Sequence, residues 1–515
     1  MRFILLLILK GIALIISLSL AAVVAAGVWF LTQDPNDLKP ELEALILEQS
    51  GVQVAINGNL SWQLLPPLTL TAENLVVTDD DTQTNAESLH LNVDISAMWE
   101  NVDQWKVSEL HLVNTTITTP SGATKLASFD LWDFRPHEPA RFEVVGSHLS
   151  SSEGATEVSG GMKGVVTYSP ATAERPERFV IADARVTSDL AEGVCQIDLS
   201  RLDSPVKPPP PEHPDDLLPL ATLLSHDLIA DCDMDRLTVG SETFQQASVR
   251  TTNTAGRHNT YLEIKDFLGG SLITEVDINL TETPIRWTVL PEMDQVDSKR
   301  LIEWRNSNVN WIANFALATD MELRGNTRTA LANSVKASSE FNGGQGEIDI
   351  SAIKQQLAQL ATLTRRTDEV ANWPDMWAYE EFVGNWRVNG KNQELELKLD
   401  NMLIEADGTL DWLTDEVDLL ANVTFSEPRE GSPYRVNPLI QDTPLPMRCR
   451  GTAADMKCRL DSDATQRLIA RALRQDDDSG LRRKLEEKID EEVPEEYRDA
   501  ARGLLDLLGR ALDGG

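Results

Sequence analysis

The sequence has few of the residues that most often catalyse reactions or bind metals. Its 515 residues include seven histidines and four cysteines, and these form neither an HExxH motif nor the CxxC spacing of a zinc site. The calcium-loop pattern is also absent around the aspartates at positions 79–81. Carboxylates are so common that a pair of them identifies no acid–base site. We therefore expect a protein that is not an enzyme and that uses no metal and no cofactor.

Positive charge is also scarce. Lysine and arginine total 46 against 82 aspartates and glutamates, which gives a formal net charge of -36. Such a chain repels nucleic acid and avoids flat contact with anionic lipid, because long-range attraction to phosphate needs a positive patch. No nucleic-acid partner is therefore expected.

Only one apolar run is long enough to cross a membrane, at residues 11–31. As a helix it would be about 31 Å long, close to the hydrocarbon core of about 30 Å. Arg2 and Lys10 precede it, which predicts a cytoplasmic amino terminus and an exported body. The alternative is a signal peptide that is cleaved before Gly27. The anchor positions would be Gly11, Ile15, Leu20, Val24, Trp29, Phe30 and Leu31, with the aromatic pair at the far interface.

A short helix and then many strands are predicted after this run. The helix begins with Asp34 or Asn36 as its cap and ends at Gly51. Alternation at period two then dominates, and it is least regular between residues 121 and 204. The fold class is therefore mainly β with short helices. Further helices are expected at 216–228, 297–304 and 353–363. Turns are expected at Asn389-Gly390 and Thr414-Asp415.

Changes in composition divide the chain into five parts. Residues 1–33 hold the cytoplasmic stub and anchor, 34–204 a first β region, 205–216 a proline-rich linker or loop, 217–460 a second β region, and 461–515 an acidic helical tail. The helical stripe of the tail could pack on the end of the sheet, dock a protein partner or touch a membrane.

The four cysteines are interpreted as two disulfides, because an exported chain is in an oxidising compartment. A two-residue hairpin loop at Ala453-Ala454 would place Cys449 and Cys458 in a non-hydrogen-bonded pair, where strands approach closely. The alternative is a pair of reduced thiols. Cys195 and Cys232 flank the proline-rich segment and would bridge it, although no turn geometry fixes their separation.

Three stretches carry a family resemblance. The first is DPNDLKPELEALILEQSG followed by NGNLSWQLLPPLTLTAENLVV. The second is CDMDRLTVGSETFQQASVR with DFLGGSLITEVDINL, and the third runs from GGQGEIDISAIKQQL through EADGTLDWLTDEVDL to PLPMRCRGTAADMKC. In this order they resemble the bacterial AsmA-like proteins of the bridge-like lipid-transfer superfamily, whose opening is similar to the first stretch. The signature positions are Asp34, Pro35, Leu42, Gly51, Gly58, Leu60, Trp62, Pro66, Gly269, Gly270 and Gly408.

The resemblance implies an elongated, taco-like antiparallel β groove, with an N-terminal transmembrane helix and a C-terminal helical segment. It places the chain in the bacterial inner membrane as a single-pass protein with its body in the periplasm. It also implies that the groove binds phospholipid acyl chains and assists phospholipid transport or outer-membrane assembly. The alternative is a cell-envelope scaffold that acts through protein partners, with its C-terminal helices as one docking element. Alternation alone does not distinguish a wall that lines a groove from a wall packed on a core.

Overall fold

The computed structural model describes most of the chain between residues 34 and 460. The described residues are 34–50, 52–63, 67–79, 82–94, 106–119, 122–151, 159–172, 175–208, 210, 215–305, 307, 309–351, 353–355, 357, 370, 372–430, 432, 434–436, 441–452 and 455–460. The expected anchor at 11–31 and the tail at 461–515 lie outside this part. Within it, no helix combines the length and the apolar character that a membrane span requires.

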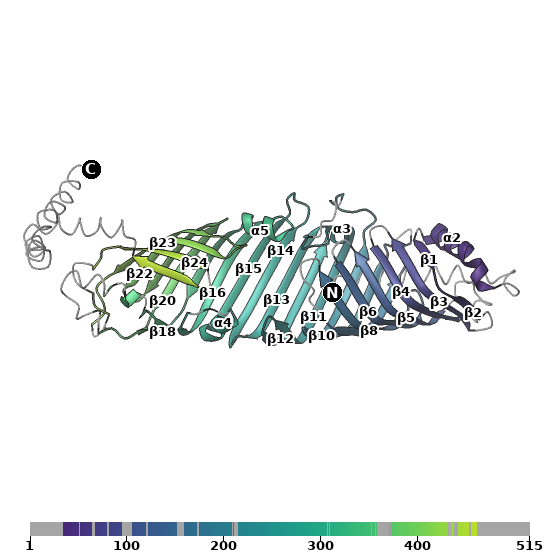
Figure 1. Ribbon diagram of the computed structural model, residues 1–515, viewed down its shortest axis with the longest axis horizontal. Coiled ribbons are helices and arrows are strands. Elements are labelled where there is room, and N and C mark those ends of the chain that lie inside the picture. The colour runs from purple at the N-terminus through teal and green to yellow at the C-terminus, as the bar shows by residue number, and fades with distance from the viewer. Residues whose placement is uncertain are drawn as a thin grey trace, which may run out of the picture. The chain divides into compact units, whose positions relative to one another are not determined.

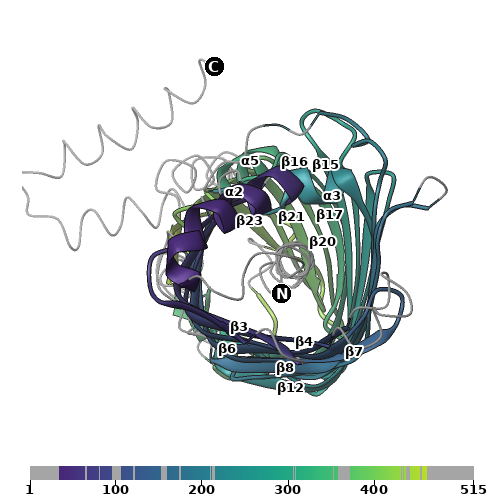
Figure 2. The same ribbon diagram turned by 90° about the vertical axis from the view of Figure 1, so that its right-hand side faces the viewer.

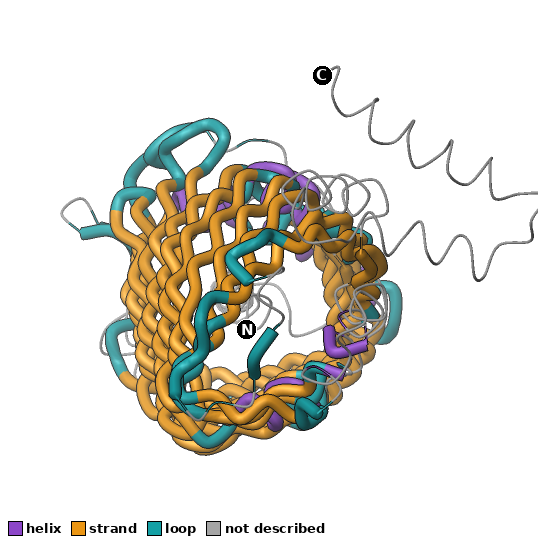
Figure 3. The backbone as a smooth tube through the Cα atoms, turned by 90° about the vertical axis from the view of Figure 1, so that its left-hand side faces the viewer, coloured by secondary structure: helices purple, strands orange, loops and turns teal. Residues whose placement is uncertain are grey.

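Strands dominate the described residues, and the few helices are short (Figures 1 and 3). The helices are η2 (Pro35–Leu38), α2 (Lys39–Ser50), α3 (Leu220–Ser225), α4 (Ser298–Trp304) and α5 (Arg328–Ser334). The prediction of a mainly β chain with short helices is confirmed.

The chain forms two compact units. The first comprises the described residues of 1–293 together with 320–334, and the second comprises those of 294–319 and 335–515. The strands that lie wholly in the first unit are β1 (Gln53–Ile56), β2 (Leu60–Gln63), β3 (Leu68–Asp79), β4 (Thr82–Asp94), β5 (Lys106–Thr119), β6 (Gly122–Phe134), β7 (Pro139–Ser151), β8 (Gly160–Ser169), β9 (Arg178–Ser188), β10 (Ala191–Arg201), β11 (His226–Val239), β12 (Glu242–Thr254), β13 (Arg257–Phe267) and β14 (Gly270–Asn279).

In the second unit lie β17 (Lys336–Asn342), β18 (Gly346–Asp349), β19 (Met376–Tyr379), β20 (Phe382–Asn389), β21 (Asn392–Leu399), β22 (Met402–Leu410), β23 (Glu416–Phe425), β24 (Leu445–Thr452) and β25 (Met456–Leu460). Two further strands, β15 (Arg286–Asp297) and β16 (Trp311–Arg324), contribute residues to both units.

The first unit is an antiparallel meander. From β3 to β14 each strand pairs with the next one in sequence, and both β1 and β2 pair with β3. The described residues of 121–204, expected to be the least regular region, include the consecutive strands β6 to β10. The segment 205–216 joins β10 to α3, and β10 and β11 pair directly on either side of it. Figure 2 shows β3, β4, β6 and β8 within one curved layer.

The amino-terminal helices complete one edge of this sheet. Asp34 caps η2 by accepting a hydrogen bond from the Asn36 backbone N–H, and Pro35 stands at its first position. The side chain of Glu43 accepts from the Ile56 N–H at 2.7 Å, and that of Asn36 accepts from the Leu60 N–H at 2.9 Å. Backbone groups at the end of β1 and at the start of β2 are therefore hydrogen-bonded by helical side chains, which suits a sheet edge.

A row of unusual backbone conformations, which we call the crease, crosses the first unit. Its members are Asn74, Glu87, Asn114, Ala127 and Gly146, and the pairs on either side of each place them opposite one another on β3 to β7. Alternate members have positive φ angles, of 51° at Asn74, 46° at Asn114 and 65° at Gly146. Asparagine and glycine are the residues that adopt this conformation most readily.

The crease shifts the alternation of side chains by one residue. On β3 the buried positions are Ala72 and then Leu75, and on β5 they are Leu112 and then Thr115, three residues apart in both strands. Two successive residues face away from the buried side at each crossing. The same face of the sheet therefore stays buried on both sides of the crease.

We expect Asn114→Val to lower the free energy of unfolding by about 1–3 kcal/mol, because a β-branched side chain is strained at positive φ. Asn114→Gly should cost much less, since glycine adopts this φ freely. Both substitutions remove the hydrogen bond that the Asn114 amide donates to Glu87, so their difference in urea unfolding isolates the backbone effect. Equal losses for the two variants would contradict this account of the crease.

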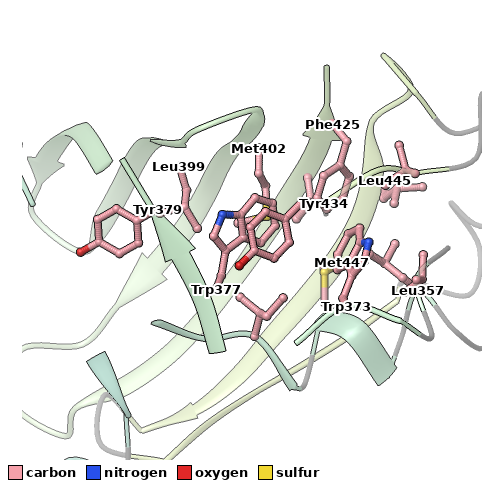
Figure 4. Packing of buried hydrophobic residues seen from close by; sticks show 14 of the residues in the cluster. Leu357, Trp373, Trp377, Tyr379, Leu399, Met402, Phe425, Tyr434, Leu445 and Met447 are labelled. Atoms are coloured by element: carbon pink, nitrogen blue, oxygen red, sulfur yellow. The ribbon is translucent and has the colours of Figure 1, made fainter. Parts of the chain in front are cut away.

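The core of the second unit is aromatic (Figure 4). The Trp377 ring stacks on Tyr434 with ring centroids 3.8 Å apart, and Trp373 meets Trp377 edge-on at 5.7 Å. The indole of Trp377 donates to Asp400 at 3.1 Å, and the Tyr434 hydroxyl accepts from the Ala378 N–H at 2.8 Å. Each buried aromatic polar group named here is thus hydrogen-bonded, which ties the segment around residue 434 to β19.

Helix α4 agrees with the prediction for 297–304, whereas α3 covers only Leu220–Ser225 of the expected 216–228 because β11 begins at His226. Asp297 caps α4 by accepting from the Lys299 N–H at 2.8 Å. Helix α3 buries Leu220, Leu223 and Leu224 against residues of β14 and β15. Most of the helix expected at 353–363 lies outside the described residues.

The turn expected at Asn389-Gly390 lies one residue later than predicted, and the signature glycines Gly269 and Gly270 lie at another tight turn. The β20–β21 loop consists of Gly390 and Lys391, because Asn389 still pairs with Asn392. The β13–β14 loop consists of Leu268 and Gly269, with φ of 52° and 89°, and Gly270 already belongs to β14. Two positive φ values match the primed turns that tight hairpins favour. Thr414-Asp415 lies in the β22–β23 connection as predicted.

Candidate functional site

One face of the first unit carries aligned rows of large apolar side chains. We call it the inward face, defined by the buried positions of β3 to β11. The first row runs from strand to strand through Leu70, Leu91, Leu110, Leu131 and Phe142, each the register partner of the next. All five side chains are buried. Antiparallel pairing brings such partners within about 4.5–5.5 Å, so the row is continuous across the strands.

A second row lies beside the first. It runs through Leu60, Ala72, Leu89, Leu112, Phe129, Val144 and Met162, from β2 to β8. Every one of these residues is buried. Further along the sheet, Val166, Ile181, Ile197 and Ala230 continue the buried apolar face from β8 to β11. We refer to these sets together as the apolar rows. The rows follow the hydrogen-bonding direction of the sheet, which is perpendicular to the strands.

The opposite, outward face is polar at the same level of the sheet. Thr71, His90, His111 and Asp130 are successive register partners between the residues of the two apolar rows. The Thr71 hydroxyl lies 3.1 Å from Nδ1 of His90, and His111 is paired with Asp130. These histidines therefore serve as surface cross-strand partners, which agrees with their position in alternating segments.

Ion pairs strengthen the polarity of the outward face. Lys106 Nζ lies 2.5 Å from Oδ1 of Asp133, and this lysine, assisted by Arg141, lowers the pKa of the Asp133 carboxyl. Arg178 is paired with Asp198, which raises the pKa of the guanidinium. The two faces of one sheet thus differ sharply: one is polar and paired, and the other is apolar and buried.

Two half-buried histidines lie near α3 in another part of the unit. Nδ1 of His226 lies 3.0 Å from the Thr222 carbonyl oxygen, and desolvation lowers the pKa of this imidazole. Desolvation also lowers the pKa of His258. Asn253, the register partner of His258, donates to the carbonyl oxygens of Leu223 and His226 at 2.7 and 2.6 Å. These contacts fasten the end of α3 to the sheet.

No group of three or more histidine, cysteine or acidic side chains suited to a metal ion occurs among the described residues. The apolar rows of the inward face offer apolar contact. A surface of this kind can take up hydrocarbon by removing it from water.

The signature positions fall at the start of the first unit and at tight strand contacts. Leu42 and Leu60 are buried, and Trp62 pairs with Leu70 at the end of the first apolar row. A Cβ at Gly58 would stand 2.6 Å from Cβ of Glu73, so glycine permits the close approach of the chain there. Gly408 is equally close to β23, since a Cβ would lie 2.1 Å from the Asp418 carbonyl oxygen. Gly51 and Pro66 lie outside the described residues, as do all the expected anchor positions.

Both cysteine pairs are joined in the structure. Cys195 and Cys232 are register partners on β10 and β11, with 4.0 Å between their Cα atoms, and they lie on the inward face. Cys449 and Cys458 are register partners on β24 and β25, also 4.0 Å apart. The hairpin register derived from the Ala453-Ala454 centre is the observed one, although those two residues lie outside the described part.

The sequence reasoning missed the crease. Its signal was present as asparagines inside alternating segments, at positions 74 and 114, where the spacing of apolar residues changes from two to three. Asparagine disfavours a strand interior, so its occurrence there indicates a special backbone conformation.

Comparison with known families gives a match to the segment that begins the apolar rows. Residues 8–120 match the model of the AsmA family, which supports an AsmA-like assignment. Among described elements, the match covers η2, α2 and β1 to β5. No curated protein and no solved structure matches the chain.

Proposed function

We propose that this AsmA-like protein binds lipid acyl chains on its inward face and assists phospholipid transport or outer-membrane assembly in the bacterial cell envelope. The observation that supports the proposal is the continuity of the apolar rows. Leu70, Leu91, Leu110, Leu131 and Phe142 follow one another without a polar residue between them. A hydrocarbon chain laid along such a row meets the same surface at every strand.

The mechanism would be partitioning. Each methylene that leaves water for an apolar surface gains about 0.8 kcal/mol, while the polar head group keeps its hydration at the margin of the sheet. Movement along the rows exchanges equivalent contacts, so no covalent step is needed. In this proposal the inward face is the lining of a groove, and the outward face with its ion pairs is the solvated wall.

The proposed location is the inner membrane, with residues 11–31 as the anchor and the body in the periplasm. Both disulfides suit an oxidising compartment. The anchor would hold the amino-terminal end of the first unit close to the membrane, where lipid could enter. The proposal also includes envelope proteins as partners that dock on residues 461–515.

Photocrosslinking from the two faces of one strand tests the proposal. A benzophenone side chain placed at Leu91, which is buried on the inward face, should form lipid adducts in cells. The matched control is Asn92, the next residue of β4, which points to the opposite face. We expect adducts with the mass of a phospholipid at Leu91 and none above background at Asn92.

The outcome also separates the proposal from the scaffold alternative. Protein adducts at both positions without lipid at Leu91 would favour an envelope scaffold, and equal lipid labelling of both faces would indicate non-specific contact with membrane. Either result would contradict lipid binding by the inward face.

A further inference from the structure

The inward face changes composition at the crease. On the side of Leu70 and Leu91 the two rows described above contain leucine, phenylalanine, valine, methionine and one alanine. On the other side, threonines enter the buried face: Thr115 on β5 is 0% exposed and Thr124 on β6 is 1% exposed. Thr84 of β4 shares this face, because it pairs with Ile117. The buried face is therefore apolar on one side of the crease and mixed on the other.

The hydroxyls of Thr115 and Thr124 have no hydrogen-bond partner in the structure. Buried polar groups are hydrogen-bonded in the great majority of cases, so two orphan hydroxyls in one place need an explanation. Valine would fill the same volume without the unsatisfied oxygen, and it is at least as favourable in a strand. The two hydroxyl groups are thus costly unless a ligand supplies an acceptor.

The two threonines are close neighbours on adjacent strands. Thr115 pairs with Leu126, and Thr124 pairs with Ile117, so the threonines occupy diagonal positions about 7–8 Å apart at their Cα atoms, with their side chains nearer. Two hydroxyl donors at this spacing can reach two acceptors of one small group, or share a single acceptor.

The surroundings restrict the kind of acceptor. The inward register partners of Thr115 are Ala86 and Leu126, and those of Ile117 are Thr84 and Thr124. None of these side chains carries a charge. A phosphate there would lose its hydration without gaining a cation, which is strongly unfavourable. A neutral carbonyl oxygen, in contrast, matches a hydroxyl donor in an apolar setting.

We propose that Thr115 and Thr124 donate hydrogen bonds to the ester carbonyl oxygens of an acyl lipid whose chains lie on the apolar rows. This inference rests on the proposed function and names its substrate class as ester-linked lipids. The chains would lie on the side of Leu91, the ester groups at the crease, and the head group beyond it. The pair therefore fixes the depth at which each lipid sits across the sheet.

The test compares an ester lipid with its ether analogue. The full-length protein in detergent is incubated with vesicles of equal parts diester and diether phosphatidylethanolamine that have identical chains, and bound lipid is counted by native mass spectrometry. The ether lacks the carbonyl acceptor. With a factor of about five for each net hydrogen bond, the wild-type protein should prefer the ester by about 5- to 25-fold.

The double variant Thr115→Val/Thr124→Val should bind both lipids with a ratio close to one. The matched control is Thr116→Val/Thr118→Val, in which Thr116 is half-buried on the outward face and Thr118 is exposed; it should keep the wild-type ratio. Thermal unfolding provides the check on folding. We expect the Thr115→Val/Thr124→Val protein to be no less stable than the wild type, because it loses only unpaired hydroxyls.

The outcomes separate the two proposals. Lipid binding with no preference for the ester in the wild type, or with the same preference in the double valine variant, would overturn the ester inference and leave lipid binding in place. Absence of any bound lipid in the wild type would overturn both.

Discussion

Replacing Leu110 with aspartate should abolish lipid loading and destabilise the first unit. Leu110 is 1% exposed and stands between Leu91 and Leu131, both 0% exposed, in the middle of the first apolar row. A carboxylate there has no cation among these partners, and burying it costs several kcal/mol even after its pKa rises. We expect lipid occupancy to fall more than tenfold, measured by mass spectrometry of lipid that copurifies with the protein.

Two further variants separate loss of folding from loss of binding. Val113→Asp introduces the same charge on the same strand, but Val113 faces outward between Ser88 and Ser128, so it should keep its lipid. Leu110→Ser is milder and should leave enough folded protein to measure, with lipid occupancy still reduced. If Leu110→Asp or Leu110→Ser kept full lipid occupancy while folded, the first apolar row would not be the binding surface.

Removing the Cys195–Cys232 disulfide should destabilise the protein more than removing Cys449–Cys458. The sequence separations are 37 and 9 residues. In the chain-entropy treatment, cross-links of these loop lengths contribute about 4 and about 2.5 kcal/mol. Paired substitutions by alanine, Cys195→Ala/Cys232→Ala and Cys449→Ala/Cys458→Ala, avoid leaving an odd thiol in each protein.

Because the disulfides lie in different units, each effect should be local. Hydrogen exchange should rise in β10 and β11 for the first double variant and in β24 and β25 for the second, with little change in the other unit. The readout is exchange measured peptide by peptide at neutral pH. A larger loss from the Cys449–Cys458 removal, or a loss spread equally over both units, would disagree with this expectation.

Much of the fold could be predicted from the sequence, because strand patterning and turn chemistry are local. The alternation in residues 68–119 predicted β3, β4 and β5, and the symmetry of CRGTAADMKC predicted the pairing of Cys449 with Cys458. The cap at Asp34 and the helix after Asp297 follow from residues that interact with their immediate neighbours. Signals of this kind need no knowledge of the rest of the chain.

Features that depend on several strands at once could not be predicted in this way. The crease exists because Asn74, Glu87, Asn114, Ala127 and Gly146 come into register, and in the sequence only the two asparagines inside alternating segments indicate it. Residues 121–204 appeared irregular because glycine and serine dilute the pattern, yet β6, β7 and β8 within this range pair with one another as strands. Pairing is a tertiary property that overrides weak local propensity.

The candidate site likewise has features that the sequence predicts and features that it does not. The apolar residues of β3 to β5 could be recognised as one side of alternating strands. Their alignment into rows could not, because register is set by the crease and the turns rather than by any single strand. The unpaired hydroxyls of Thr115 and Thr124 became visible only once their burial and their partners were known.

The direction of the apolar rows determines how such a protein can change in length. Since the rows cross the strands, each additional hairpin of the meander lengthens them by about 10 Å, two strand spacings, and leaves the cross-section of the wall unchanged. Duplicating a hairpin such as β4–β5 would therefore extend the path without redesigning the surface along it. Within one family, the length of the apolar rows could be changed by changing the number of hairpins, much as a helical repeat protein is lengthened by adding repeats.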